Sequence, residues 1–188
     1  MGWLKDESGL EKNAANHVPL TPLSHLNRAA ALFPDKTAIV DRGRRFTYAE
    51  CRARASQLAS ALAEAGVAPG DVVATLLPNI LAQAEAHWGV PATGAVLNTI
   101  NTRLDVDTIA YIFGHGEAKV ALVDTAFLGV AEAALERMEG AGPRIIEVAD
   151  DQAGLPASGR HTEYEEFIAG GDAGFTWHMP ADEWESLS

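Results

Sequence analysis

The sequence has little of several residue types, and each shortage excludes a class of protein. Cys51 is the one cysteine in 188 residues, which excludes an internal disulfide and a thiolate metal cluster. No apolar run approaches the length of a membrane span, and the first residues carry no secretory signal. Basic residues number 14 against 26 acidic ones, and the net charge of −12 opposes nucleic acid binding. We expect a soluble, cytoplasmic protein in which Cys51 is a small core residue.

Motifs for nucleotide, metal and hydrolase chemistry are also missing. No Gly-x-x-x-x-Gly-Lys-Ser/Thr loop occurs, and the glycines of segment 114–119 follow an expected helix and precede a strand, the reverse of a dinucleotide fingerprint. No two of the six histidines have the helical spacing of a zinc site, and no Gly-x-Ser-x-Gly elbow is present. Acidic pairs such as Asp105 with Asp107 fall at helix starts, where capping explains them. We predict no catalytic, cofactor-binding or metal-binding residue.

What is present is a regular alternation of two patterns. Segments typical of strands are 37–41, 44–47, 72–77, 95–100, 118–124 and 144–148. Segments with helical periodicity are 21–33, 47–66, 79–88, 105–113 and 126–139, followed by a short capped helix within 162–171. Strands that alternate with helices at this spacing predict βαβ units. The sequence therefore predicts an α/β fold with a largely parallel sheet and helices on both faces.

Local signals mark where these elements begin and end. Thr47 and Glu50 form a capping box, and Asn79 and Asp105 are expected to cap the helices that follow them. Gly66 is placed to end a helix in the left-handed conformation. The two short strands before residue 48 flank a turn at Gly43 and suggest a hairpin.

The chain divides into three parts that differ in how clearly they show helical or strand periodicity. Residues 1–18 form an extended segment, residues 19–148 form the α/β core, and residues 149–188 hold a loop, a short helix and an irregular tail. Trp177 and Trp184 lie in the tail without helical or strand periodicity. We expect them to pack against something outside this chain.

Ligands of parallel-sheet proteins bind beyond the carboxyl ends of the strands. A binding site is therefore expected first in the loops at these ends and in the helices that follow them. His87, Trp88 and Gly89 are the candidate residues for a substrate pocket, because an aromatic side chain followed by glycine near a strand end can line one. Packing of Trp88 in the core is the alternative.

Three segments together resemble a known family. They are FPDKTAIVDRGRRFTYAE at 33–50, GVAPGDVVATLLPN at 66–79, and WGVPATGAVLNTINTRLDVDTIAYIFGHGEAKVALVD at 88–124. Their order and spacing resemble the N-terminal part of the large domain of adenylate-forming, AMP-binding acyl-CoA synthetases, from about residue 19 onward. Segment 89–104 is most similar to the branch that activates medium-chain or methylthio-substituted acids.

The resemblance implies a reaction for the full-length family. Such an enzyme joins a carboxylic acid to ATP with the help of Mg, releases pyrophosphate, and passes the acyl group of the acyl adenylate to CoA. The family's Ser/Thr/Gly-rich loop with its lysine, its ribose-binding aspartate and its C-terminal lysine have no counterpart here. We therefore expect an N-terminal fragment, truncated before the phosphate-binding loop, that is inactive alone and binds no cofactor. The expected partners are the remainder of the synthetase chain and, in the full-length enzyme, the carboxylic acid; a homodimer is left open.

Two other hypotheses remain. The chain could be a non-enzymatic α/β interaction module derived from the family, which a coding sequence continuing into a Ser/Thr/Gly-rich loop would exclude. It could also be a small α/β binding domain whose likeness is accidental. A well-formed cleft at the strand ends without an exposed apolar flank would favour that last hypothesis.

Overall fold

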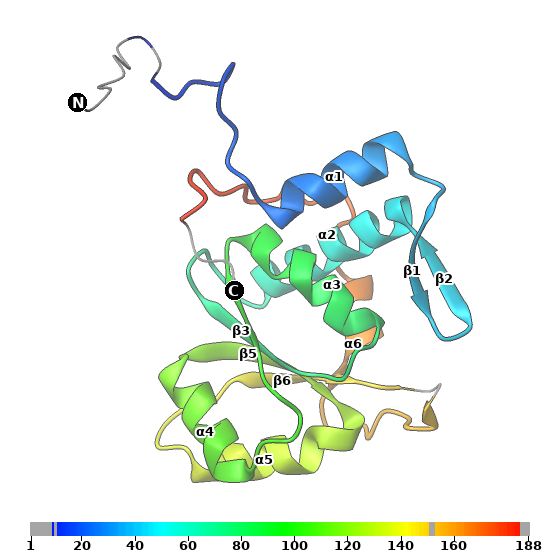
Figure 1. Ribbon diagram of the computed structural model, residues 1–188. Coiled ribbons are helices and arrows are strands. Elements are labelled where there is room, and N and C mark those ends of the chain that lie inside the picture. Colours follow the sequence, from blue (N-terminus) through cyan, green and yellow to red (C-terminus); the bar gives the residue numbers. More distant parts are fainter. Residues whose placement is uncertain (1–8, 10, 151–152, 185–188) are drawn as a thin grey trace, which may run out of the picture.

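Helices and strands alternate along the chain in the computed structural model, which describes residues 9, 11–150 and 153–184 (Figure 1). The strands are β1 (Thr37–Asp41), β2 (Arg44–Thr47), β3 (Val72–Leu76), β4 (Val96–Thr99), β5 (Ala118–Asp124), β6 (Arg144–Val148) and β7 (Thr162–Glu163). The helices are α1 (Pro22–Leu32), α2 (Tyr48–Glu64), α3 (Leu81–Gly89), α4 (Val106–His115), α5 (Leu128–Arg137) and α6 (Tyr164–Ala169), with 3-10 turns η1 (Pro91–Thr93) and η2 (Thr125–Phe127). Among these residues, no helix combines the length and apolar character that a bilayer crossing requires.

The main sheet has five parallel strands in the order β4-β3-β5-β6-β7. Strand β3 lies inside it, with Val73 opposite Leu97 of β4 on one side and Val120 of β5 on the other. Parallel neighbours need a crossover, and α3, α4 and α5 supply the three crossovers from β3 to β6. The predicted α/β fold with a largely parallel sheet is confirmed.

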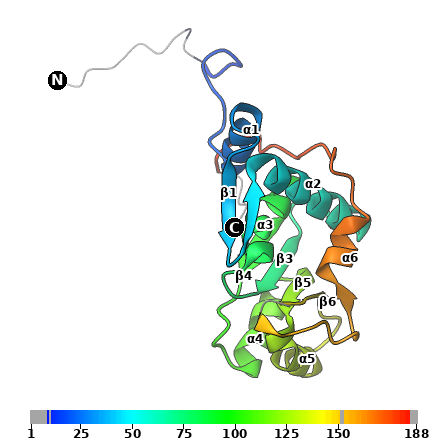
Figure 2. The same ribbon diagram turned by 90° about the vertical axis from the view of Figure 1, so that its right-hand side faces the viewer.

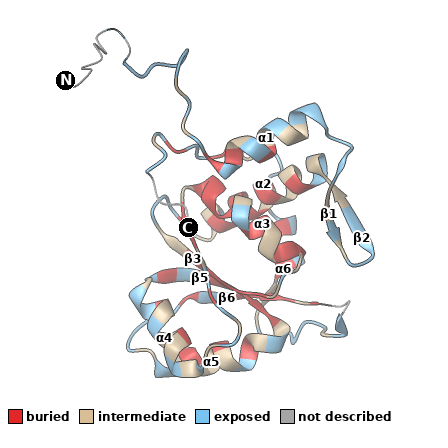
Figure 3. Cartoon of the chain, in the orientation of Figure 1, coloured by how far each residue is buried: buried red, intermediate tan, exposed pale blue. Residues whose placement is uncertain are grey.

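Each face of the sheet has its own apolar core, which puts helices on both faces (Figure 1; Figure 3). Helices α2, α3 and α6 cover one face, where Leu58, Ala86 and Ile168 are buried against the sheet. Helices α4 and α5 cover the other face through residues such as Phe113 and Leu128. Strands covered on both sides read as continuous apolar runs, which explains the β5 sequence AKVALVD.

Most predicted helix ends are confirmed. The Thr47 hydroxyl accepts a hydrogen bond from the Glu50 amide at 3.2 Å, and the Glu50 carboxylate accepts one from the Thr47 amide at 2.7 Å. The Asp105 carboxylate accepts a hydrogen bond from the Thr108 amide at 2.9 Å. Gly66 has a φ of 91°, the left-handed conformation expected after α2.

The predicted boundaries of two helices are wrong. Asn79 does not cap α3: the amide of Ile80 bonds to the Pro78 carbonyl at 2.8 Å, and this tight turn leaves Asn79 outside the helix. Ile80 is the N-cap instead and provides no side-chain hydrogen bond. The helix expected at 126–139 is split into η2 and α5, because the Asp124 carboxylate accepts a hydrogen bond from Ala126 and stabilises a separate 3-10 turn.

The part of the tail around Trp177 packs on α2, so the expectation that Trp177 packs against something outside this chain is wrong. Trp177 is 7% exposed, its indole N–H donates to the Ser56 hydroxyl at 2.8 Å, and the Arg52 guanidinium lies 5.2 Å from the ring centre. Trp184 is 93% exposed, and what covers it stays a prediction. Cys51 is fully buried, as predicted.

Strands β1 and β2 form an antiparallel hairpin that is not hydrogen-bonded to the main sheet. It extends from α1 and α2 and runs alongside α3 (Figures 1 and 2). The residue in the left-handed conformation at its turn is Arg42, with a φ of 52°, and not Gly43. A non-glycine residue held there is uncommon and costs conformational energy.

Candidate functional site

A cavity of about 620 Å³ lies beside α3, next to the carboxyl end of β3. Strand β3 ends at Leu76, and Pro78 and Asn79 connect it to α3. This end of a parallel sheet is where ligands bind in α/β proteins, since the connections there diverge and leave a crevice.

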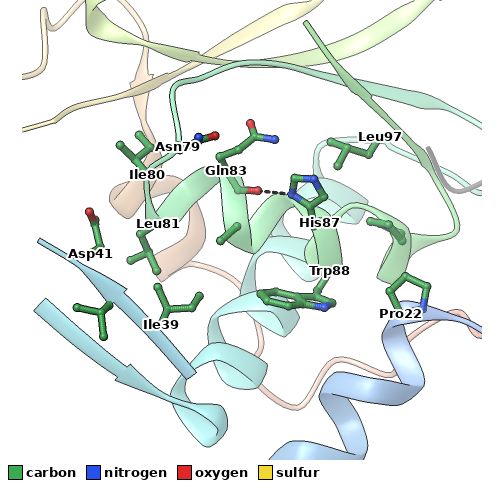
Figure 4. Close-up of a pocket in the computed structure, with 13 residues that line it drawn as sticks. Pro22, Ile39, Asp41, Asn79, Ile80, Leu81, Gln83, His87, Trp88 and Leu97 are labelled. Atoms are coloured by element: carbon green, nitrogen blue, oxygen red, sulfur yellow. Dashed lines mark hydrogen bonds between the residues drawn. The ribbon is translucent and has the colours of Figure 1, made fainter. Parts of the chain in front are cut away.

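The wall of this cavity is mostly apolar and comes from α1, the hairpin, α3 and β4 (Figure 4). The aliphatic side chains of Ile39 and Leu81 point toward each other across it, and the Trp88 ring forms its floor in this view. Asp41 is the one charged residue of the lining, and it is paired with Arg44 at 2.6 Å. The lining residues are Pro22, Ile39, Val40, Asp41, Asn79, Ile80, Leu81, Gln83, Ala84, His87, Trp88, Pro91 and Leu97.

A second cavity of about 600 Å³ adjoins the first and is more polar. The two cavities share Asn79, Gln83 and His87. No lysine, arginine, aspartate or glutamate lines the second cavity, although the whole chain carries a net charge of −12. Its lining residues are Leu77, Pro78, Asn79, Gln83, His87, Thr99, Ile100, Asn101 and Thr102.

The shared polar residues leave hydrogen-bonding capacity for a ligand. His87 Nδ1 lies 2.7 Å from the backbone oxygen of Gln83, which fixes the imidazole ring and directs Nε2 away from that contact. The Gln83 Oε1 atom is buried and has no hydrogen-bond partner among the described residues. Because buried polar atoms are almost always paired in folded proteins, this oxygen is suited to accept a hydrogen bond from a bound molecule.

The opposite face of α3 is fixed by a buried carboxylate, Glu85, which is fully inaccessible to solvent. Arg54 of α2 forms an ion pair with Glu85 through Nε, and a second hydrogen bond through Nη2 at 3.1 Å. The Tyr164 hydroxyl of α6 donates to Glu85 at 2.7 Å, and Arg54 also bonds to Glu165 at 2.6 Å. One carboxylate therefore joins the three helices that cover this face of the sheet.

Burial and the hydrogen bonds within the cluster shift the pKa values of its members in opposing directions. Burial raises the pKa of the Glu85 carboxyl above its ordinary value, although Arg54 and the Tyr164 hydroxyl oppose the shift. Burial and the adjacent Glu85 charge both raise the pKa of Tyr164. Burial alone would lower the pKa of Arg54, but hydrogen bonds to Glu165 and Glu85 outweigh it and raise this pKa. The cluster is thus a structural anchor for α3, directed away from the cavity.

The structure separates the three candidate pocket residues. His87 and Trp88 line the cavity, and His87 also lines the adjoining one. Gly89 faces α2: a Cβ atom there would lie 2.6 Å from Leu58 Cδ2, so the absent side chain permits close packing of α2 and α3. Sequence reasoning missed Gln83 and the hairpin wall, for which the sequence offers no periodic or motif signal.

Comparisons with known proteins agree on one family. The family model described as AMP-binding enzyme matches residues 26–172. The peroxisomal acetate/butyrate–CoA ligase of Arabidopsis thaliana is 40% identical over 98% of this chain and 34% of its own length. The acetate–CoA ligase of Humulus lupulus is 39% identical over the same shares. The trans-cinnamate:CoA ligase of Petunia hybrida is 48% identical over 68% of this chain and 22% of its own length.

Solved structures show the same relationship. A benzoate CoA ligase from Burkholderia xenovorans has a TM-score of 0.70 and 25% identity, over 85% of this chain and 29% of that one. The chain spans about a third of the length of the curated relatives it matches, which agrees with a fragment of such a ligase. With a family match across most of its residues, the chain belongs to the AMP-binding enzyme family.

Proposed function

We propose that this chain is the N-terminal part of an acyl-CoA synthetase, which joins a carboxylic acid to CoA through an acyl adenylate at the expense of ATP. The family match over residues 26–172 supports the reaction class. The observation that carries the role of this part is the apolar cavity of about 620 Å³ at the carboxyl end of β3. A cavity of this size with a few convergent polar groups is the usual form of a small-molecule site.

In this proposal the hydrocarbon part of the acid occupies the cavity above Trp88, and its carboxylate faces the adjoining polar cavity. The amide groups of Asn79 and Asn101 offer hydrogen-bond donors there. No acidic side chain lines that space to repel a carboxylate. Related ligases are named for acetate, butyrate and trans-cinnamate, and activation of a medium-chain or methylthio-substituted acid stays a prediction.

The described residues do not fit Mg-ATP. They contain no group of three or more histidine, cysteine, aspartate or glutamate side chains placed to hold a metal ion. The cavities at the end of β3 have no lysine or arginine in their linings, and a triphosphate needs such cations or a glycine-rich loop. We therefore assign ATP, Mg and CoA binding to the remainder of the synthetase and derive no chemical step from this chain.

Two further assignments stay predictions. The location expected from the sequence is cytoplasmic, while the names of some relatives place those proteins in peroxisomes. A homodimer is equally untested.

The reaction class is tested by ATP–pyrophosphate exchange on two proteins. The isolated 188-residue chain is expected to give no exchange with any acid. A chimaera, in which this chain replaces the matching third of the Arabidopsis acetate/butyrate–CoA ligase, is expected to give exchange that depends on butyrate. A folded chimaera without exchange, beside an active parent ligase, would instead favour the non-enzymatic interaction module.

The role of the cavity is tested in the same chimaera by Ala84→Trp, which fills the space beside Trp88. We expect the KM for butyrate to rise about tenfold, equivalent to about 1.4 kcal/mol of lost binding. Tyr111→Ala, an exposed aromatic residue on α4, is the matched control and should leave KM unchanged. An unchanged KM in both variants would show that the acid does not bind in this cavity. The proposed reaction class would not be affected by that result.

A further inference from the structure

Strand β4 forms one edge of the main sheet, and among the described residues its one neighbouring strand is β3. The amides of Val96 and Ile100 both donate to carbonyl oxygens on the β3 side, at 2.8 Å. The hydrogen-bonding groups of successive residues in a strand point to opposite sides in the plane of the sheet, so the amides of Leu97 and Thr99 point away from β3. Backbone donors therefore face outward along β4, and an edge of this kind is a template for a further strand.

The other sheet edges are protected against a further strand, whereas the β4 edge is not. Strand β7, at the opposite edge, is two residues long. Strand β4 has four residues with the uncharged sequence VLNT, contains no proline, and pairs with β3 without a bulge. Proteins block exposed edges with very short strands, charges, proline or bulges, and an edge without charge, proline or bulge is one that we expect another strand to cover. The hairpin, in contrast, carries the charged residues Asp41, Arg42, Arg44 and Arg45.

The last part of the described chain leads from the β7 edge to the β4 edge. After β7, α6 packs on the face of the sheet that α2 and α3 cover, with Ile168 buried there. The tail then crosses α2, where the Trp177 indole bonds to Ser56. The amide of His178 donates to the Ala92 carbonyl at 2.8 Å, in the turn just before β4 begins. The tail therefore brings the chain to the amino-terminal end of β4.

A strand reached by this route has the handedness that parallel sheets require. Helix α3 connects β3 to β4 across the same face of the sheet and in the same direction, toward the β4 edge. Connections between parallel strands of one sheet are almost always right-handed, and a strand beyond β4 that follows α6 and the tail has the same hand as the β3-α3-β4 unit. Trp184, at the end of the described tail, is 93% exposed and offers a large apolar side chain for that further chain to cover.

We propose that the segment of the synthetase that follows this chain forms a sixth parallel strand of the main sheet, beside β4. The inference rests on the proposed function, which supplies this further chain, since the 188 residues span 34% of the Arabidopsis ligase. Residues after the added strand emerge at the carboxyl end of β4, where Thr99 and Asn101 line the second cavity. The described lining of that cavity has no charged residue, so the chain beyond the strand is placed to bring charged groups to a ligand there.

Hydrogen exchange followed by mass spectrometry measures the pairing of this edge without any ligand. Residues 95–101 are compared in the 188-residue chain and in the chimaera with the Arabidopsis ligase, and fragmentation of the peptide separates the individual amides. We expect the amides of Leu97 and Thr99 to exchange at least about tenfold more slowly in the chimaera, because a partner strand must open before they exchange. The amides of Val96 and Ile100, already bonded on the β3 side, are the internal reference and should change less.

A pair of proline variants tests the same edge through stability. Thr99→Pro removes an outward-facing donor and leaves the bonds to β3 intact, since a strand tolerates proline where its amide faces away from the neighbouring strand. It should change the melting temperature of the 188-residue chain little, but lower that of the chimaera and accelerate exchange of the Leu97 amide there. Asn98→Pro is the matched control, because the Asn98 amide faces β3, and it should lower the melting temperature of both proteins.

Equal exchange of the Leu97 and Thr99 amides in the 188-residue chain and in a folded chimaera would overturn the proposal. Protection in the 188-residue chain that rises with protein concentration would also overturn it, because a second copy would then occupy the edge. Circular dichroism shows whether each protein is folded; if Thr99→Pro is not, the comparison without substitutions decides.

Pyrophosphate exchange is recorded separately, so that the two proposals fail in different ways. An active chimaera with an unprotected β4 edge would contradict the added strand and leave the proposed function intact. A folded, inactive chimaera with a protected edge would support the added strand and count against the proposed function.

Discussion

The anchor of α3 makes a quantitative prediction. In Arg54→Met, the fully buried Glu85 carboxylate loses its ion pair and, among the residues that the structure describes, keeps the hydrogen bond from Tyr164. Removing one partner of a buried pair costs about 3–5 kcal/mol, and because the Arg54 side chain is 20% exposed we expect about 3 kcal/mol. This is a large part of the roughly 5–15 kcal/mol that keeps a domain folded. Urea unfolding followed by circular dichroism at pH 7 measures the change.

Two companion variants separate the buried pair from a general effect of removing an arginine. Arg137→Met breaks an exposed pair with Asp107, whose side chains are 63% and 76% exposed, and should cost less than about 1 kcal/mol. Replacing Arg54, Glu85 and Tyr164 together by Met, Leu and Phe leaves no buried polar group of the cluster unpaired, since the remaining partner of Arg54, Glu165, is 54% exposed to solvent. This triple variant should recover most of the loss.

The stability that Arg54→Met loses should depend on pH in a defined direction. Burial raises the pKa of Glu85, and without Arg54 the pKa rises further. A carboxyl whose pKa is raised in the folded state contributes stability below its unfolded pKa and loses that contribution as the pH rises through the folded pKa. The destabilisation of Arg54→Met should therefore grow from pH 5 to pH 8. A loss below about 1 kcal/mol that does not change with pH would refute the assignment of Glu85 as a buried ion that depends on Arg54.

Two further substitutions test packing and charge. Gly89→Ala places a Cβ atom 2.6 Å from Leu58 and should lower stability by about 1–3 kcal/mol in thermal unfolding, whereas Gly129→Ala, in α5 with no atom within 4 Å of its Cβ, should be neutral or stabilising. Burial of Glu147 would raise its pKa, but hydrogen bonds from Ser158 and Thr125 outweigh burial and lower this pKa. The ionised Glu147 carboxylate therefore contributes to folding stability above pH 4.5, and this contribution is lost as the pH falls through the folded pKa. Glu147→Gln should therefore lose less stability than the parent between pH 7 and pH 4 in urea titrations, and an equal loss would contradict the assignment.

The sheet and its covering helices were predictable because their signals are local. Continuous apolar runs such as that of β5 indicate strands buried on both faces, and the capping box at Thr47 and Glu50 marks a helix start within four residues. The start of α3 was not predictable from Asn79, since a tight turn between Pro78 and Ile80 competes with the cap and leaves no sequence pattern of its own.

The cavity could be predicted only in part, because its walls meet through long-range contacts. The ion pair of Arg42 with Asp150 and the hydrogen bonds of Arg54 with Glu165 join residues 108 and 111 positions apart, and no periodicity relates such distant residues.

Adjacent residues on α3 show the same limit at short range. An α-helix turns about 100° per residue, so neighbours point to different sides. Trp88 therefore faces the cavity, while Gly89 faces α2 at Leu58, although the sequence suggested one role for both. The residue types at 87–89 indicated a candidate pocket. The packing of α3 between the hairpin and α2 determines whether each of these residues lines the cavity or contacts α2.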